Sequence, residues 1–193
     1  MTRSIHEIHA ESFIYQFMDK EKKRIIKGMP ATIEEIQENF TRTIRKMRPG
    51  DVRVFQEIQI SSIPKKNVSS RVNVSASLIQ FCKSRCLDDY QKNSIYGHIQ
   101  DVYNTKNLRY DFLVCKMDAS GNLQMTAIEV NGPQHYFGTG PKFASQITRD
   151  IAKMIASRNL GIKFIEIDAS NGISPAGYEL IEKELKKFGA KKV

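Results

Sequence analysis

Long hydrophobic runs are missing from this chain. It has no stretch of about eighteen apolar residues, so no membrane span is expected, and its first residues lack the apolar segment of a signal peptide. Cysteine is scarce as well. Cys82, Cys86 and Cys115 are an odd number, which indicates reduced thiols rather than a disulfide framework. These absences predict an intracellular, cytoplasmic protein, with the nucleus or an organelle left open.

Two familiar small-site patterns are incomplete. Cys82 and Cys86 lie four residues apart on an expected helix and His98 follows, but the sequence offers no fourth zinc ligand. We therefore expect buried apolar thiols. The glycine-containing loop at 136–142 lacks the Gly-Lys-Ser/Thr of a phosphate-binding P-loop.

Acidic residues are outnumbered by basic ones. The chain of 193 residues has 30 Lys and Arg against 21 Asp and Glu, a formal net charge of +9. A folded protein this basic tends to associate with phosphate polyanions, so nucleic acid, DNA or RNA, is an expected partner. The charge alone does not separate nucleic acid from an acidic protein partner or an acidic membrane surface, and it leaves the oligomeric state open, a homodimer included.

Hydrophobic periodicity predicts an α/β fold, with a mixed central sheet flanked by helices. We expect residues 1–50 to form an N-terminal helical region packed on a core of residues 51–193, which carries a helical insertion at 61–107. Expected helices lie at 4–27, 32–47, 78–87, 89–103, 143–159 and 174–188, and expected strands at 52–60, 108–114, 125–131 and 161–167. The last two strands are joined through a helix, which predicts a parallel connection.

Two consecutive strands each carry one carboxylate. Asp111 interrupts an apolar run, a turn follows at 118–122, and Glu129 interrupts the next apolar run. A carboxylate in an apolar strand is costly to bury unless its charge is compensated. Two of them on one hairpin therefore indicate a shared Mg²⁺ or Mn²⁺ ion. The alternative is that each acid lies at a strand edge and points to solvent.

An imidazole, an acid and an amine follow in the sequence. His135 comes shortly after the second strand, and Asp150 and Lys153 are three residues apart, so both reach one side of the expected helix. Glu57 in the first strand is either a surface acid or a third carboxylate near the metal.

The order of these residues resembles a known nuclease superfamily. Asp111, the block Glu-Val-Asn-Gly-Pro-Gln-His at 129–135 and Arg-Asp-Ile-Ala-Lys at 149–153 are similar to the PD-(D/E)xK superfamily, and most of all to its very-short-patch-repair branch. The resemblance covers roughly residues 51–168 and implies a restriction-endonuclease-like core and a Mg²⁺-dependent endonuclease.

The resemblance also implies roles for particular residues. Asp111, Glu129 and the carbonyl of Val130 would hold Mg²⁺ or Mn²⁺. His135 would act as a base or orient water, with Asp150 in support, and Lys153 would replace the usual strand lysine. Three departures accompany the match: Asn131 stands where that lysine often lies, Tyr110 precedes the first acid in place of proline, and the superfamily's helix glutamate has no clear counterpart.

Other basic residues are candidates for phosphate contacts. Those beside the site or in the insertion are Lys142, Arg149, Lys65, Lys66 and Arg71, although the insertion can equally be a solvated linker. The cluster Arg42, Arg45, Lys46 and Arg48 either offsets a helix dipole or contacts phosphate. Tyrosines at 90, 96 and 103 either stack on unpaired bases or pack a small satellite core.

Besides a protein-interaction subunit whose basic faces meet acidic partners, two function classes that act on nucleic acid follow from these residues. The first is a metal-dependent nuclease. The second is a catalytically inactive nucleic-acid-binding module, because the block at 129–136 also resembles the RAP domain, a nuclease-like module linked with RNA binding.

Overall fold

The computed structural model describes residues 4–17, 26–27, 33–63 and 108–189. The expected insertion, with the cysteines at 82 and 86, His98, the three tyrosines and the candidates Lys65, Lys66 and Arg71, lies outside the described residues apart from 61–63.

A five-stranded sheet in the order β1-β2-β3-β4-β5 forms the centre of the protein. Its strands are β1 (Ile26–Lys27), β2 (Val52–Gln59), β3 (Arg109–Met117), β4 (Leu123–Asn131) and β5 (Lys163–Asp168). β2, β3 and β4 pair antiparallel, whereas β1 on β2 and β5 on β4 are parallel. The mixed sheet and the parallel last connection were predicted from the sequence and are confirmed.

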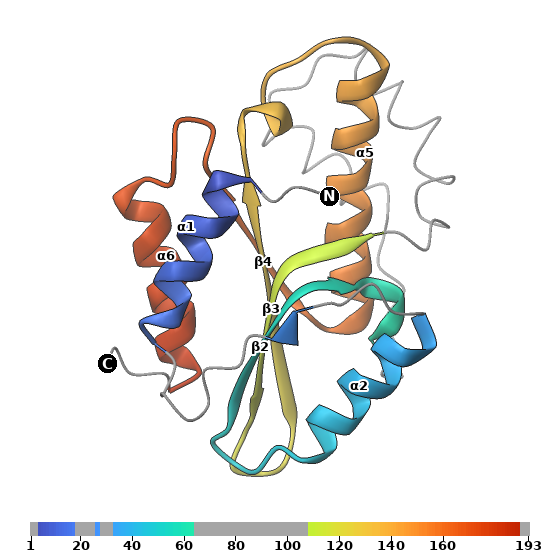
Figure 1. Cartoon of the computed structure of the whole chain (residues 1–193), viewed down its shortest axis with the longest axis vertical. Helices are drawn as coiled ribbons and strands as arrows, with labels where there is room; N and C mark the ends of the chain where they lie inside the picture. The colour runs from blue at the N-terminus through green and yellow to red at the C-terminus, as the bar shows by residue number, and fades with distance from the viewer. Residues whose placement is uncertain (1–3, 18–25, 28–32, 64–107, 190–193) are drawn as a thin grey trace.

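Helices cover both faces of this sheet (Figure 1). One face packs against α1 (Ile5–Tyr15) and α6 (Pro175–Lys187), and the other against α2 (Ile33–Arg45) and α5 (Gly140–Leu160). β3 is buried on both faces: Phe112 and Val114 join the first core, and Leu113 and Cys115 join the second. This double burial explains why the strand reads as a continuous apolar run.

Local signals in the sequence set most element boundaries. Ser4 caps α1 in a reciprocal capping box with Glu7. Asp118 Oδ1 accepts the backbone N–H groups of Ser120 and Asn122, which closes the β3–β4 turn. Gly161, with φ of 67°, ends α5 in the left-handed conformation that glycine adopts without strain.

Two predicted boundaries were wrong. The helix expected at 4–27 ends at Tyr15, and Ile26–Lys27 instead pairs with Phe55–Gln56, where a β-branched residue suits an extended strand. The helix expected from residue 143 begins at Gly140, because Pro141 fits the first helical turn, where its missing N–H costs nothing. The expected loop is therefore shortened to residues before 140.

The spacing of Val52, Val54, Ile58 and Ile60 would place all four on one face of a regular strand, but the structure divides them between the two faces. Val54 packs with α1 and α6, whereas Ile58 packs on the opposite face. Glu57 between them has φ of 50°, a left-handed conformation that rotates the strand. β3 switches faces at the same level, because Phe112 and Tyr110 belong to opposite cores and Asp111 lies between them.

Candidate functional site

The β3–β4 ladder stops where the two carboxylates lie. Its last registered pair is Phe112 with Ile128, so the next residues along the two strands are Asp111 and Glu129. Two side-chain contacts continue the pairing: Asp111 Oδ2 accepts the backbone N–H of Val130 at 2.8 Å, and Glu129 Oε1 accepts the backbone N–H of Asp111 at 3.2 Å. The two acids therefore lie side by side at the point where the strands part.

Lys153 reaches this point from α5. Its Nζ lies 2.5 Å from Oε2 of Glu129, and its side chain is 12% exposed against 3% for the glutamate. The nearby Asn131 amide donates to Glu166 Oε1 at 2.9 Å. The amine at the site therefore comes from Lys153 on α5. On β4, the position two residues after Glu129 is occupied by the neutral amide of Asn131.

Among the described residues, the site holds more negative charge than Lys153 offsets. Burial, then the charge of Asp111, raises the pKa of Glu129 well above its usual range despite Lys153. Burial also raises the pKa of Asp111, against the lowering effect of Lys153 and the Val130 N–H. Burial alone would lower the pKa of Lys153, but the carboxylates outweigh it and raise that pKa. A cation placed between the acids would relieve this imbalance.

A histidine–aspartate pair adjoins the carboxylates. His135 Nδ1 lies 2.9 Å from Asp150 Oδ2, and both side chains are buried. Gln146, one turn before Asp150 on α5, donates to its Oδ1 at 3.1 Å. With Nδ1 donating to the carboxylate, the lone pair of the imidazole is on Nε2. The pair belongs to the same electrostatic cluster, since Asp150 raises the pKa of Glu129 and His135 lowers that of Asp111.

Two contributors to this site were not predicted. Gln146 supports Asp150, and its spacing of four residues on one helix face was the available signal. Glu7 in α1 raises the pKa of Asp111 through its charge, so an acid of the first helix does lie near the site. Nothing in the local sequence marked Glu7 beyond its role in the capping box, because its approach depends on how α1 packs across the sheet.

The remaining candidates lie farther out. Lys142 is exposed in the first turn of α5, and Arg149 is partly exposed beside Asp150. Glu57 stands opposite the kink in β3 and forms an ion pair of 3.7 Å with Arg109. Cys115 is a free thiol in the core, and burial raises its pKa.

The donor set fits a hard divalent ion with few protein ligands. Within the described ranges, no group of three or more His, Cys, Asp or Glu side chains could hold a metal. Mg²⁺, however, is commonly bound by one or two carboxylates together with waters and substrate phosphates. Asp111 Oδ1 makes no hydrogen bond to a described residue, and the paired acids are under-compensated. Asp111 and Glu129 therefore fit an open site, in which the ion keeps waters and binds substrate phosphate, rather than a site closed by protein ligands alone.

Comparisons with known proteins add no family to this description. No family model, no curated protein and no solved structure matches the chain. Among the described helices, none is both long and apolar enough to span a bilayer.

Proposed function

We propose that this chain is a metal-dependent nuclease with a restriction-endonuclease-like core that hydrolyses phosphodiester bonds, DNA in preference to RNA. The observation that carries the proposal is the convergence of Asp111 and Glu129 at the parting of β3 and β4, with Lys153 as their one close amine. Buried acids with raised pKa values and a single cationic partner are typical of functional sites.

A divalent ion is the cofactor that this arrangement fits. Asp111, Glu129 and the carbonyl of Val130 would hold Mg²⁺ or Mn²⁺, which supplies a polarised phosphate and a more acidic bound water. Lys153, kept charged by its raised pKa, would place positive charge beside the non-bridging phosphate oxygens.

His135 is the group best placed to accept a proton. Asp150 fixes its Nδ1, so Nε2 is the acceptor atom, and Gln146 holds Asp150 from its other oxygen. A carboxylate that orients an imidazole in this way also stabilises the imidazolium formed on proton uptake. Burial of both side chains keeps the pair in one geometry.

A cleavage assay tests the proposal. Linear duplex, branched duplex and single-stranded DNA, and matching RNA, are incubated with Mg²⁺ or Mn²⁺ and separately with EDTA. We expect metal-dependent fragments from the wild type and none from Asp111→Asn, while both proteins bind the substrate. Fragments formed equally by Asp111→Asn would contradict the assignment.

One observation favours a second candidate, a nucleic-acid-binding module without catalysis. Asn131 replaces the strand lysine and is itself bonded to Glu166, and the available amine is already paired with Glu129. In that case the same assay would show salt-dependent binding and no fragments with any metal.

A further inference from the structure

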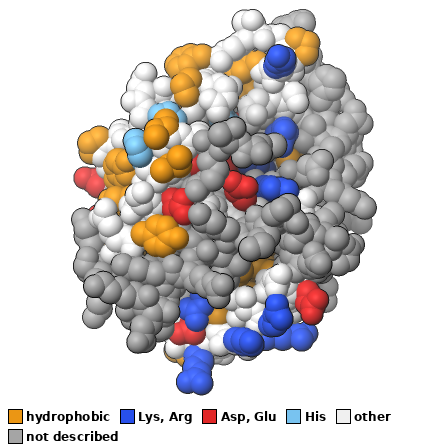
Figure 2. Space-filling model, viewed as in Figure 1, with side chains coloured by type: hydrophobic (Ala, Val, Ile, Leu, Met, Phe, Trp, Pro, Cys, Tyr) orange, Lys and Arg blue, Asp and Glu red, His pale blue; other side chains and the backbone are white. Residues whose placement is uncertain are grey.

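Four exposed basic side chains gather where α2 ends. Arg42 and Arg45 belong to its last turn, and Lys46 and Arg48 to the loop into β2. Figure 2 shows Lys and Arg side chains collected at the lower end of the visible face, over this half of α2 and the start of β2. We call Arg42, Arg45, Lys46 and Arg48 the α2 patch.

Contacts with the described residues do not account for this cluster. Arg42 bonds to the neutral Asn39, and no member of the α2 patch forms an ion pair with a described residue. Positive charge near a helix C-terminus is favourable. Arg42, however, lies three residues before Arg45 and four before Lys46, which places these like charges side by side. Like charges at that spacing repel by about as much as opposite charges attract. The patch therefore gains little from helix stabilisation alone.

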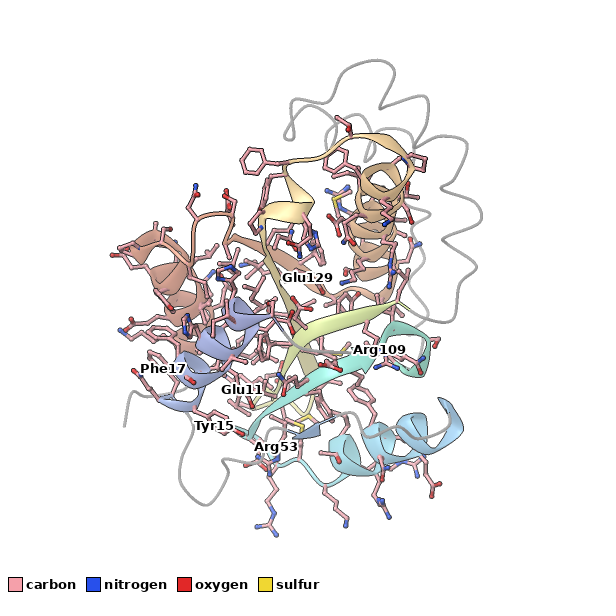
Figure 3. All side chains as sticks on the ribbon, turned by 45° about the horizontal axis from the view of Figure 1, so that its top comes forward. Glu11, Tyr15, Phe17, Arg53, Arg109 and Glu129 are labelled. Carbon is pink, nitrogen blue, oxygen red and sulfur yellow. The ribbon has the colours of Figure 1, made fainter. Side chains whose placement is uncertain are left out.

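The α2 patch lies at one end of the central sheet, just before the start of β2, and the acidic site lies farther along the same sheet. Arg53, which follows the patch, lies at the far end of the sheet from Glu129 (Figure 3). β2 starts at Val52, which lies opposite Lys116 on β3. Lys116 is five residues along β3 from Asp111, so the start of β2, next to the patch, lies about 17 Å from Asp111.

We propose that the α2 patch is a second contact surface for the phosphate backbone of a nucleic-acid duplex, about 5 base pairs from the bond held at Asp111 and Glu129. This inference rests on the proposed nuclease function. A duplex is a straight polyanion, so one molecule is long enough to reach both places. A membrane surface fits less well, because the exposed large apolar residues of the described chain are Ile5, Ile8 and Phe137, none of them beside the patch.

The test compares two variants of equal charge. Arg42→Gln/Arg45→Gln/Arg48→Gln removes three charges from the patch. Arg158→Gln/Lys183→Gln/Lys186→Gln removes three from exposed positions on α5 and α6. Binding to a duplex is measured in EDTA over a series of salt concentrations, and thermal melts establish that both variants fold. We expect the log–log salt slope to fall by about 2.7 in the patch variant, or about 0.9 per contact, and to stay unchanged in the control.

Cleavage of two duplexes sharpens the test. One carries an arm of about 15 base pairs on the patch side of the cut and the other an arm of about 3, too short to reach the patch. The patch variant should show a raised KM and an unchanged kcat on the long arm, and wild-type values on the short arm.

The possible outcomes separate this inference from the proposed function. A wild type that cuts, with a patch variant that keeps the full salt slope, overturns the patch alone. An equal loss of slope in the control overturns it too, as does patch-dependent binding only to vesicles of anionic lipid. A patch-dependent slope without cleavage by any metal upholds the patch and overturns the nuclease.

Discussion

Two buried glutamates, Glu129 in β4 and Glu184 in α6, differ in how their charge is balanced. Each is 2% exposed, and each accepts a lysine ammonium at 2.5 Å. Glu184 has a second lysine, Lys187 at 2.7 Å, and these hydrogen bonds outweigh burial and lower its pKa. Glu129 shares its single lysine with Asp111, and its pKa is raised.

The difference teaches what a glutamate–lysine pair can signify. At Glu184 the acid ties β5 to α6 through Lys163 and its charge is fully met, so the cluster is structural. At Glu129 the surplus of acid makes the folded protein less stable than a neutral site would, and either a bound proton or a further cation relieves it. The predictions that follow test this contrast, beginning with the largest expected effect.

Substitution of Glu129 should impair catalysis strongly, whereas substitution of Glu184 should not. Glu129→Gln removes one of the two proposed metal ligands and should lower kcat/KM by about 1,000-fold or more. Glu184→Gln is the matched control, since it changes an equally buried acid with the same lysine distance, and it should cut within about 2-fold of the wild type. The measurement is steady-state cleavage of one duplex in Mg²⁺. Equal losses in both variants would erase the functional contrast.

Removal of the imidazole should give the next largest effect. His135→Ala should slow cleavage by about 100-fold, the lower end of what general acid–base catalysis contributes. Because the imidazole is the proposed proton acceptor, its removal should also change the pH–rate profile. Asp150→Asn should slow the reaction while binding is kept, because it only orients the ring. An unchanged profile in His135→Ala would leave the histidine a structural role.

A divalent ion should stabilise the protein through the Glu129 cluster. Mn²⁺ at about 100 times its Kd adds about 2.7 kcal/mol to the free energy of unfolding. The gain should grow as pH rises, because below its raised pKa Glu129 is protonated and the ion must displace that proton. Thermal melts with and without Mn²⁺ measure the effect. Asp111→Asn should lose the gain and Glu184→Gln should retain it; the reverse result would place the ion elsewhere.

The two clusters should also respond to pH with opposite signs in the absence of metal. An acid whose pKa is raised in the folded state binds its proton more tightly there than in the unfolded chain. The contribution of Asp111 to the free energy of unfolding therefore falls as pH rises through its folded pKa. Glu184, with a lowered folded pKa, contributes stability above its unfolded pKa and loses it as pH falls through the folded one.

Matched substitutions should show these signs at pH 7. Asp111→Asn should raise the free energy of unfolding by roughly 1 kcal/mol, because a neutral amide removes the repulsion with Glu129. Glu184→Gln should lower it by roughly 1 kcal/mol, since Lys163 and Lys187 are 48% and 53% exposed and regain water. Urea unfolding at pH 5, 7 and 9 measures both, and destabilisation by Asp111→Asn would contradict the account of under-compensated charge.

Much of this architecture follows from local pattern. The alternation and turn residues predicted the β3–β4 hairpin, and the pairing of Asp111 with Glu129 followed from two acids placed in apolar strands. Asp150 and Lys153 were predicted to share a helix side, and both lie at the site. Short-range chemistry was sufficient for these features because the hairpin and one helix carry all of them.

Long-range features were beyond such reasoning. The pairing of Ile26 with Phe55 and the approach of Glu7 to Asp111 depend on how distant segments pack, which periodicity does not record. The left-handed Glu57 was equally hidden, because glutamate carries no turn signal and its φ follows from the kink shared with β3.

Glu57 provides the smallest expected effect and the finest test of where the site ends. It faces the β3 kink at Asp111, yet it pairs with Arg109 at 3.7 Å, and both side chains are partly exposed. Such pairs contribute between about 0 and 1 kcal/mol. Glu57→Gln should therefore change the free energy of unfolding by less than about 0.5 kcal/mol, leave cleavage within about 2-fold, and keep the Mn²⁺ stabilisation. A loss of that stabilisation would make Glu57 a third carboxylate of the metal site, and the boundary between catalytic and structural acids would move one strand outward to β2.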